Sequence, residues 1–196
     1  MDSPALLIID VQQGLDNPAL RKRTNLNAEA NIARLLKLWR DSHLPVIHIQ
    51  HCSTDPDSLL QPHLPGNAFK PEAMPVSGEA VFQKTVNSAF IGTELESYLK
   101  SEQIKQLVIV GLTTDHCVSS SVRMAGNLGF EVILVGDATA TFERYDNDGK
   151  LISAQDMHRI HLASLSGEFC RVISTAEICD RVFQIDLGEG RHPANR

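Results

Sequence analysis

Short runs of consecutive apolar residues alternate along the chain with segments in which apolar residues recur every three or four positions. The short runs are typical of buried strands and lie at 5–9, 45–50, 80–83, 107–110, 131–135 and 170–174. Helical spacing marks 27–42, 93–101, the segment between 110 and 131, and 153–166. This alternation predicts an α/β fold built on a mostly parallel sheet covered by helices.

The connections predict one domain rather than two. Residues 1–188 contain all the expected elements and no linker-like stretch, and residues 189–196 have the composition of a polar C-terminal tail. The segment 52–78 is long and rich in proline. A connection of that length inside a compact domain is usually a lid or a binding loop.

Composition and charge exclude several classes of protein. The net charge is −6 and the longest basic cluster, Arg21 to Arg23, is short, so we expect no nucleic-acid partner. No apolar run approaches the ~20 residues of a membrane span, and the start of the chain lacks the features of an export signal. The four cysteines have no zinc-type spacing. We therefore expect reduced thiols, a cytoplasmic location and no membrane partner.

Three residues with complementary chemistry follow predicted strands. Asp10 and Lys84 each come directly after a strand, and Cys117 stands at a strand-to-helix turn, where the helix dipole favours a thiolate. Because the carboxyl ends of parallel strands share one edge of a sheet, all three are expected there. A carboxylate that accepts the thiol proton and an ammonium that stabilises the thiolate would make Cys117 a nucleophile for acyl transfer. Each also has a plainer interpretation, as a buried thiol, a turn-capping aspartate or a solvated lysine.

Three blocks of sequence together resemble the isochorismatase-like cysteine hydrolases, a superfamily that includes nicotinamidases and N-carbamoylsarcosine amidohydrolases. The blocks read IIDVQQG, FQKTVNSAF and GLTTDHCVSSSVRMAGNLGFEVILVGDATAT, and the resemblance covers roughly residues 5–176. It implies a doubly wound, Rossmann-like sheet of about six strands with helices on both faces. It also implies a catalytic triad of Asp10, Lys84 and Cys117, and a homo-oligomer, either dimer or tetramer.

The resemblance further implies a mechanism at the turn before Cys117. Family members carry a non-proline cis peptide there, which falls at Leu112–Thr113. The backbone N–H groups of Thr113 and Cys117 would form the oxyanion hole. The implied reaction is hydrolysis of a C–N bond in a small amide, carbamoyl or ureido substrate through a thioacyl-enzyme, without a cofactor.

The sequence also predicts a substrate pocket around this triad. Its predicted residues come from the segments next to the three blocks: Gln12, Phe90, His116, Phe142 and Arg144. Phe90 is equally compatible with a place in the core, and Arg144 with an ordinary surface position. Gln12 is expected to brace nearby backbone.

The chain departs from the nicotinamidase pattern at its second strand. Nicotinamidases have a metal-binding Asp-x-His there, whereas this chain reads HIQHCSTDP. His48 and His51 alone are weak evidence for a metal, so no metal site is predicted. Family members that cleave isochorismate lack the nucleophilic cysteine, so Cys117 argues against that reaction.

The sequence leaves two other classes of protein to consider. A non-catalytic small-molecule-binding or scaffold protein on the same fold is disfavoured by the intact triad. A nucleotide-binding protein is disfavoured because the chain has neither of the glycine-rich phosphate-binding motifs.

Overall fold

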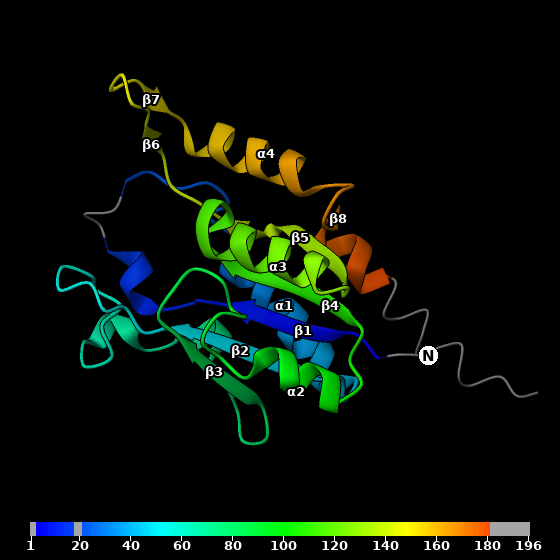
Figure 1. The fold of residues 1–196 in the computed structure, drawn as a ribbon. Coiled ribbons are helices and arrows are strands. Elements are labelled where there is room, and N and C mark those ends of the chain that lie inside the picture. Colours follow the sequence, from blue (N-terminus) through cyan, green and yellow to red (C-terminus); the bar gives the residue numbers. More distant parts are fainter. Residues whose placement is uncertain (1–2, 18–20, 181–196) are drawn as a thin grey trace, which may run out of the picture.

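A six-stranded, wholly parallel sheet forms the centre of the molecule (Figure 1). The structure is a computed structural model that describes residues 3–17 and 21–180. The strands lie in the order β3-β2-β1-β4-β5-β8. Their bounds are β1 Ala5–Ile9, β2 Val46–His51, β3 Ala80–Lys84, β4 Gln106–Leu112, β5 Glu131–Ala140 and β8 Arg171–Ile173. The predicted α/β class, the parallel sheet and its six strands are confirmed.

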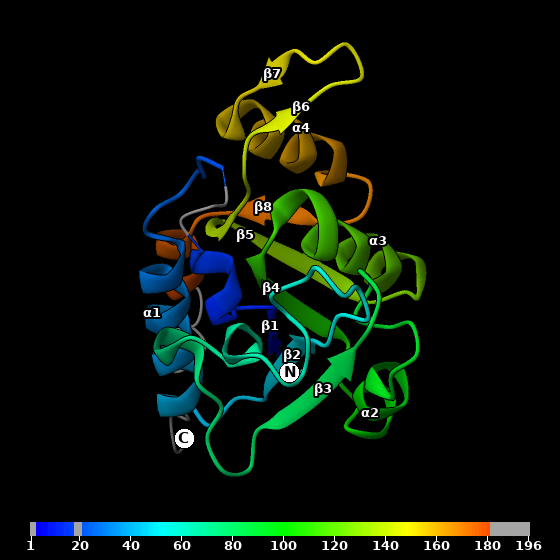
Figure 2. The same ribbon diagram turned by 90° about the vertical axis from the view of Figure 1, so that its left-hand side faces the viewer.

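Helices cover both faces of the sheet, as Figure 2 shows. Helix α1 (Ala28–Asp41) packs on one face through apolar side chains at helical spacing, among them the fully buried Ile32, Leu35 and Trp39. Helices α2 (Leu95–Ser101) and α3 (Ser119–Asn127) cover the other face. The strands are therefore buried on both sides, which explains why they read as continuous apolar runs rather than as alternating ones.

Strand β5 extends to Ala140, five residues beyond the predicted end at residue 135. The additional segment pairs with the end of β4 after a register shift between Ile109 and Gly111. Gly111 has φ of 125°, and a Cβ atom there would lie 2.1 Å from the carbonyl oxygen of Ile9. Only glycine allows this close approach of β4 to β1, directly before the turn that carries Cys117.

A short hairpin and the helix that follows it project from one end of the sheet in both views. The hairpin pairs β6 (Arg144–Tyr145) with β7 (Leu151–Ile152), and α4 (Ala154–Leu165) begins at the N-cap Ser153. The sequence predicted α4 but not the hairpin, because two-residue strands among polar residues leave no periodic signal.

The proline-rich connection 52–78 is anchored to the body of the molecule. It contains two short 3-10 helices, Pro65–Asn67 and Pro71–Ala73. Between them the nearly buried Lys70 ammonium lies 2.6 Å from both Asp16 and Glu29. Along the residues that the structure describes, no helix is long and apolar enough to span a membrane. The predicted tail, 189–196, falls outside the described ranges.

Candidate active site

The candidate site lies at the carboxyl edge of the sheet, beyond the ends of β1, β3 and β4. Asp10 directly follows β1, with φ of 51°, a left-handed conformation that aspartate tolerates better than most residues. Lys84 is the last residue of β3. Cys117 lies in a π-helical turn, Thr114–Val118, which joins β4 to α3. The parallel topology therefore brings together the three residues that the sequence singled out.

The three side chains are in direct contact. The Lys84 Nζ donates a 2.6 Å hydrogen bond to Asp10 Oδ2 and lies 3.3 Å from Cys117 Sγ. Asp10 and Lys84 are each only 1% exposed, whereas Cys117 is half-buried and accessible. The other Asp10 oxygen, Oδ1, is buried and has no hydrogen-bond partner among the described residues. Asp10 therefore has an oxygen available to accept the thiol proton.

The expected thiolate is contradicted by the surroundings of Cys117. Burial, and then the charge of Asp10, raise the pKa of this thiol to about 12, although Lys84 acts in the opposite direction. Burial also raises the pKa of the Asp10 carboxyl. Burial therefore favours the neutral form of both groups, and the charge of Lys84 acts against it at both. Moving the proton from Cys117 to Asp10 leaves the net charge unchanged, so the thiolate can form without burying additional charge.

His51, the last residue of β2, completes this cluster, and its contact with the triad was not predicted. Its Nδ1 lies 3.0 Å from Lys84 Nζ, and the two residues are register partners across β2 and β3. Burial and the neighbouring ammonium lower the pKa of the His51 imidazole. Strand register would have revealed this contact, since both residues end neighbouring strands, but sequence alone does not say which strands are neighbours.

Lys84 lies among the groups of this site that could serve as metal ligands. Asp10, His51 and Cys117 offer three potential ligand atoms within 4.8 Å of one another, but the Lys84 ammonium is bonded to all three. The cation that these groups hold is therefore the ammonium. His48 does not join them, because its buried ring bonds Glu79, 2.8 Å away, on the opposite face of β2.

The backbone of the turn before Cys117 is held by hydrogen bonds of its own. The peptide bond Leu112–Thr113 is cis, and the carbonyl of Thr113 accepts from the N–H groups of His116 and Val118. Thr113 itself is buried. These contacts fix the backbone on both sides of the thiol, while the oxyanion hole formed by Thr113 and Cys117 stays a prediction.

The predicted pocket residues differ in how far they are open to the site. Phe90 and Phe142 are 9% and 6% exposed, and the Phe90 ring stacks on Phe130. His116 is exposed beside the nucleophile. Gln12 is fully buried, and its amide bonds the backbone on both sides of His51, so it braces the chain as expected.

Arg144 is occupied by an ion pair within the chain. Its Nε and Nη2 each lie 2.9 Å from Oδ2 of the buried Asp115, whose other oxygen accepts from Thr141. The hydrogen bond from Thr141 and the charges of His116 and Arg144 hold the pKa of Asp115 low despite its burial. A role for Arg144 in binding substrate would require it to bind the substrate in addition to Asp115.

A second residue that the sequence did not single out, Asn87, lies at the mouth of the site. Its exposed side chain places Oδ1 3.7 Å from Cys117 Sγ. It belongs to the loop that follows Lys84. A side-chain amide in that place can both donate to and accept from a polar substrate.

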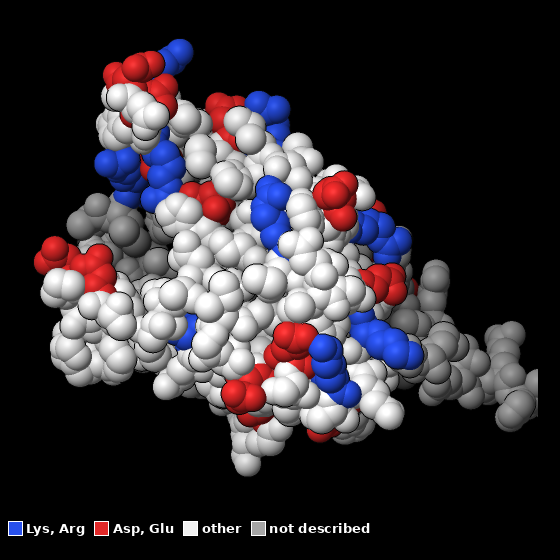
Figure 3. Space-filling model, in the orientation of Figure 1, with Lys and Arg blue, Asp and Glu red and all other residues white. Residues whose placement is uncertain are grey.

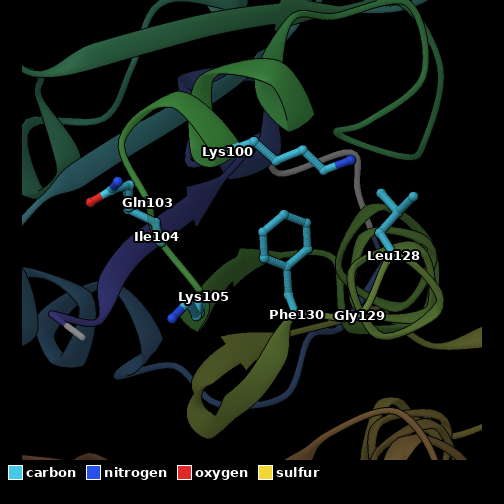
Figure 4. Close-up of a pocket in the computed structure, with 7 residues that line it drawn as sticks. All are labelled: Lys100, Gln103, Ile104, Lys105, Leu128, Gly129 and Phe130. Carbon is cyan, nitrogen blue, oxygen red and sulfur yellow. The ribbon is translucent and has the colours of Figure 1, made fainter. Parts of the chain in front are cut away.

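A hollow lies elsewhere, between the end of α2 and the loop that leads into β5 (Figure 4). It has a volume of about 480 Å³ and is lined by Lys100, Gln103, Ile104, Lys105, Leu128, Gly129 and Phe130. These residues precede β4 and β5, so the hollow is at the amino edge of the sheet, opposite the triad.

On the face shown in Figure 3, acidic and basic side chains are interspersed.

Comparison with known proteins agrees with this architecture. The model of the isochorismatase domain matches residues 4–177. The isochorismatase family protein YrdC of Bacillus subtilis (strain 168) is 45% identical over 177 residues, which cover 90% of this chain and 95% of that protein. A crystal structure of an isochorismatase-family protein from Chromobacterium violaceum superposes with a TM-score of 0.91 at 46% identity and covers 94% of this chain and 95% of that one.

Several relatives are enzymes named for their substrates, among them nicotinamidase 3 of Arabidopsis thaliana and a maleamate amidohydrolase. Maleamate amidohydrolase of Pseudomonas putida is 30% identical over 148 residues, which cover 67% of this chain and 70% of that enzyme. The family model extends over nearly the whole described chain, including every strand of the sheet and all three residues of the triad. The chain therefore belongs to the isochorismatase family of hydrolases.

Proposed function

We propose that this protein is a cysteine hydrolase that cleaves a C–N bond in a small amide, carbamoyl or ureido compound. The observation that supports this most directly is the contact of the Lys84 ammonium with both Asp10 and the accessible thiol of Cys117. The amide substrate of the related maleamate amidohydrolase agrees with that class of bond.

The first half-reaction transfers the acyl group to sulfur. Asp10 removes the proton of Cys117, and the Lys84 ammonium stabilises the thiolate as it attacks the substrate carbonyl carbon. The oxyanion of the tetrahedral intermediate accepts from the backbone N–H groups of Thr113 and Cys117. Asp10 then protonates the departing nitrogen, the C–N bond breaks, and ammonia or an amine leaves.

The second half-reaction restores the enzyme. Asp10, now a carboxylate again, removes a proton from water, and the resulting hydroxide attacks the thioester carbonyl. The C–S bond breaks, the acid product leaves, and the proton returns from Asp10 to the Cys117 sulfur. The raised pKa of Asp10 suits its role as the base, because a carboxyl that holds its proton more tightly is a stronger base.

The test is ammonia release from a panel of primary amides, carbamoyl compounds and ureido acids. We expect at least one of these classes to be hydrolysed by the wild-type protein and not by Cys117→Ala. Cys179→Ala is the matched control, because it removes a buried thiol that packs under the opposite face of the sheet. Equal turnover by Cys117→Ala and wild type would refute the mechanism. Absence of turnover with the whole panel would favour a binding protein on this fold.

Two further expectations accompany this proposal. By its family resemblance the chain assembles as a dimer or tetramer, which sedimentation velocity measures directly. We also expect the four cysteines, all free in the structure, to be reduced thiols in solution, which a thiol titration of the unfolded protein measures.

A further inference from the structure

The ammonium of Lys84 has a hydrogen-bond acceptor for each of its three hydrogens. The acceptors are Asp10 Oδ2 at 2.6 Å, His51 Nδ1 at 3.0 Å and Cys117 Sγ at 3.3 Å. Asp10 and Cys117 exchange a proton in the proposed reaction, so their bonds to Lys84 change in strength as the reaction proceeds. His51 has no such part in the chemistry, and its bond to Lys84 can stay constant throughout.

His51 is itself held from several directions. Its backbone N–H donates to Gln12 Oε1 at 2.8 Å, and its carbonyl accepts from Gln12 Nε2 at 3.0 Å and from Asn67 Nδ2 at 2.8 Å. Gln12 is fully buried and Asn67 nearly so. The position of the ring relative to Lys84 is thus set by buried hydrogen bonds and by the pairing of β2 with β3.

The contact determines the protonation of the ring. Because an ammonium only donates, His51 Nδ1 accepts and carries no proton. The neutral ring then has its proton on Nε2, and it also makes a hydrogen bond to the backbone of Val86. Asp10, Lys84 and Cys117 are the titratable side chains around it. Burial and the charge of Lys84 both favour the neutral ring over the cation, against the weaker effect of Asp10.

We propose that His51 is a positioning residue for the triad, accepting through Nδ1 the third hydrogen of the Lys84 ammonium and so directing the other two at Asp10 and Cys117. This inference rests on the proposed cysteine-hydrolase function. Without an acceptor at this place, the ammonium is free to rotate and shift toward water, and it is no longer aimed at the thiolate when the thiolate forms. Positioning of this kind acts on the chemical step rather than on binding of substrate.

Two substitutions of His51 separate positioning from simple structural support. Leucine removes the acceptor, whereas the Oδ1 of asparagine can occupy nearly the place of Nδ1, since both atoms are bonded to Cγ. We expect His51→Leu to lower kcat about 100-fold, the loss typical of a misplacement near 1 Å, with little change in KM. His51→Asn should recover most of that loss. His63→Leu, at an exposed histidine outside the site, is the control and should behave as wild type.

Nitrogen-15 NMR tests the same contact without requiring turnover. The His51 ring signals are assigned by their loss in His51→Asn. We expect the neutral Nε2–H tautomer in the wild-type protein, and a change in the Nδ1 shift in Lys84→Met. A proton on Nδ1, an unchanged Nδ1 shift in Lys84→Met, or a wild-type kcat in His51→Leu would overturn the inference. If wild type hydrolyses nothing in the panel, the proposed function fails, while the NMR result still decides whether His51 holds Lys84.

Discussion

Replacing Asp10 with asparagine should make Cys117 more reactive toward an alkylating agent while abolishing hydrolysis. The amide keeps an oxygen that can accept from Lys84, but it carries no charge and cannot take up the thiol proton. In the wild-type protein the Asp10 charge contributes to the raised pKa of the thiol, which is about 12. Removing that charge leaves the Lys84 ammonium, 3.3 Å from the sulfur, as the dominant charge next to Cys117.

The size of the effect follows from the distance between the two groups. The reactive atoms of Asp10 and Cys117 lie within 4.8 Å, where two unit charges at an effective dielectric of about 20 interact by about 3.5 kcal/mol. That energy equals about 2.5 pKa units. The thiolate fraction at pH 8 then rises about 300-fold, and the lower nucleophilicity of a more acidic thiol reduces the net gain to about 20-fold.

The assay is the rate of iodoacetamide modification at Cys117, followed by mass spectrometry of the peptide that contains it. Lys84→Met is the matching variant with the opposite expected effect on the alkylation rate. Loss of the ammonium raises the pKa of the Cys117 thiol, so alkylation should be slower than in the wild-type protein. Circular dichroism establishes that both variants are folded. An alkylation rate in Asp10→Asn equal to or below that of wild type would show that Asp10 does not control the thiol.

Two further predictions concern stability. Arg40 and His48 both form hydrogen bonds with Glu79, and the pKa of the Glu79 carboxyl is lowered to about 2. The ionised Glu79 therefore contributes its full share to the free energy of unfolding above pH 4.5, which is the pKa of the group in the unfolded chain. That contribution is lost as the pH falls toward 2. Glu79→Gln should therefore cost up to about 3 kcal/mol at pH 7 in urea titrations and flatten the loss of stability between pH 4.5 and 2, and an unchanged acid profile would contradict this. Gly111→Ala brings a Cβ to 2.1 Å from the Ile9 carbonyl oxygen and should cost about 4 kcal/mol or more; a melting temperature equal to wild type would show that the strands can separate there.

The features that sequence could predict depend on local patterns. Strand β1 was predicted with its exact bounds, and α1 to within one residue at each end, because consecutive apolar runs and helical spacing are local signals. Placing Asp10, Lys84 and Cys117 at one edge required only a parallel sheet. The order of the strands is a non-local property, which is why the pairing of β2 with β3, and with it the contact of His51, was not anticipated.

The protonation of the site illustrates a second limit. Helix position alone favours a thiolate at Cys117, but the structure adds burial and a carboxylate, which act in the opposite direction and dominate. Burial cannot be read from the residues next to Cys117, because the groups that cover it come from β1, β3 and the loop after β3. The same holds for Arg144, whose partner Asp115 is 29 residues away in the chain.

The central claim is that Cys117 carries the acyl group during turnover. Rapid acid quenching of a reaction with a substrate identified from the panel, followed by mass spectrometry, tests this directly. The mechanism predicts a mass increase equal to the acyl part of the substrate, located on Cys117 and absent from Cys117→Ala. Steady turnover in which the nitrogen is released without any adduct on Cys117, or with the adduct on another residue, would contradict it.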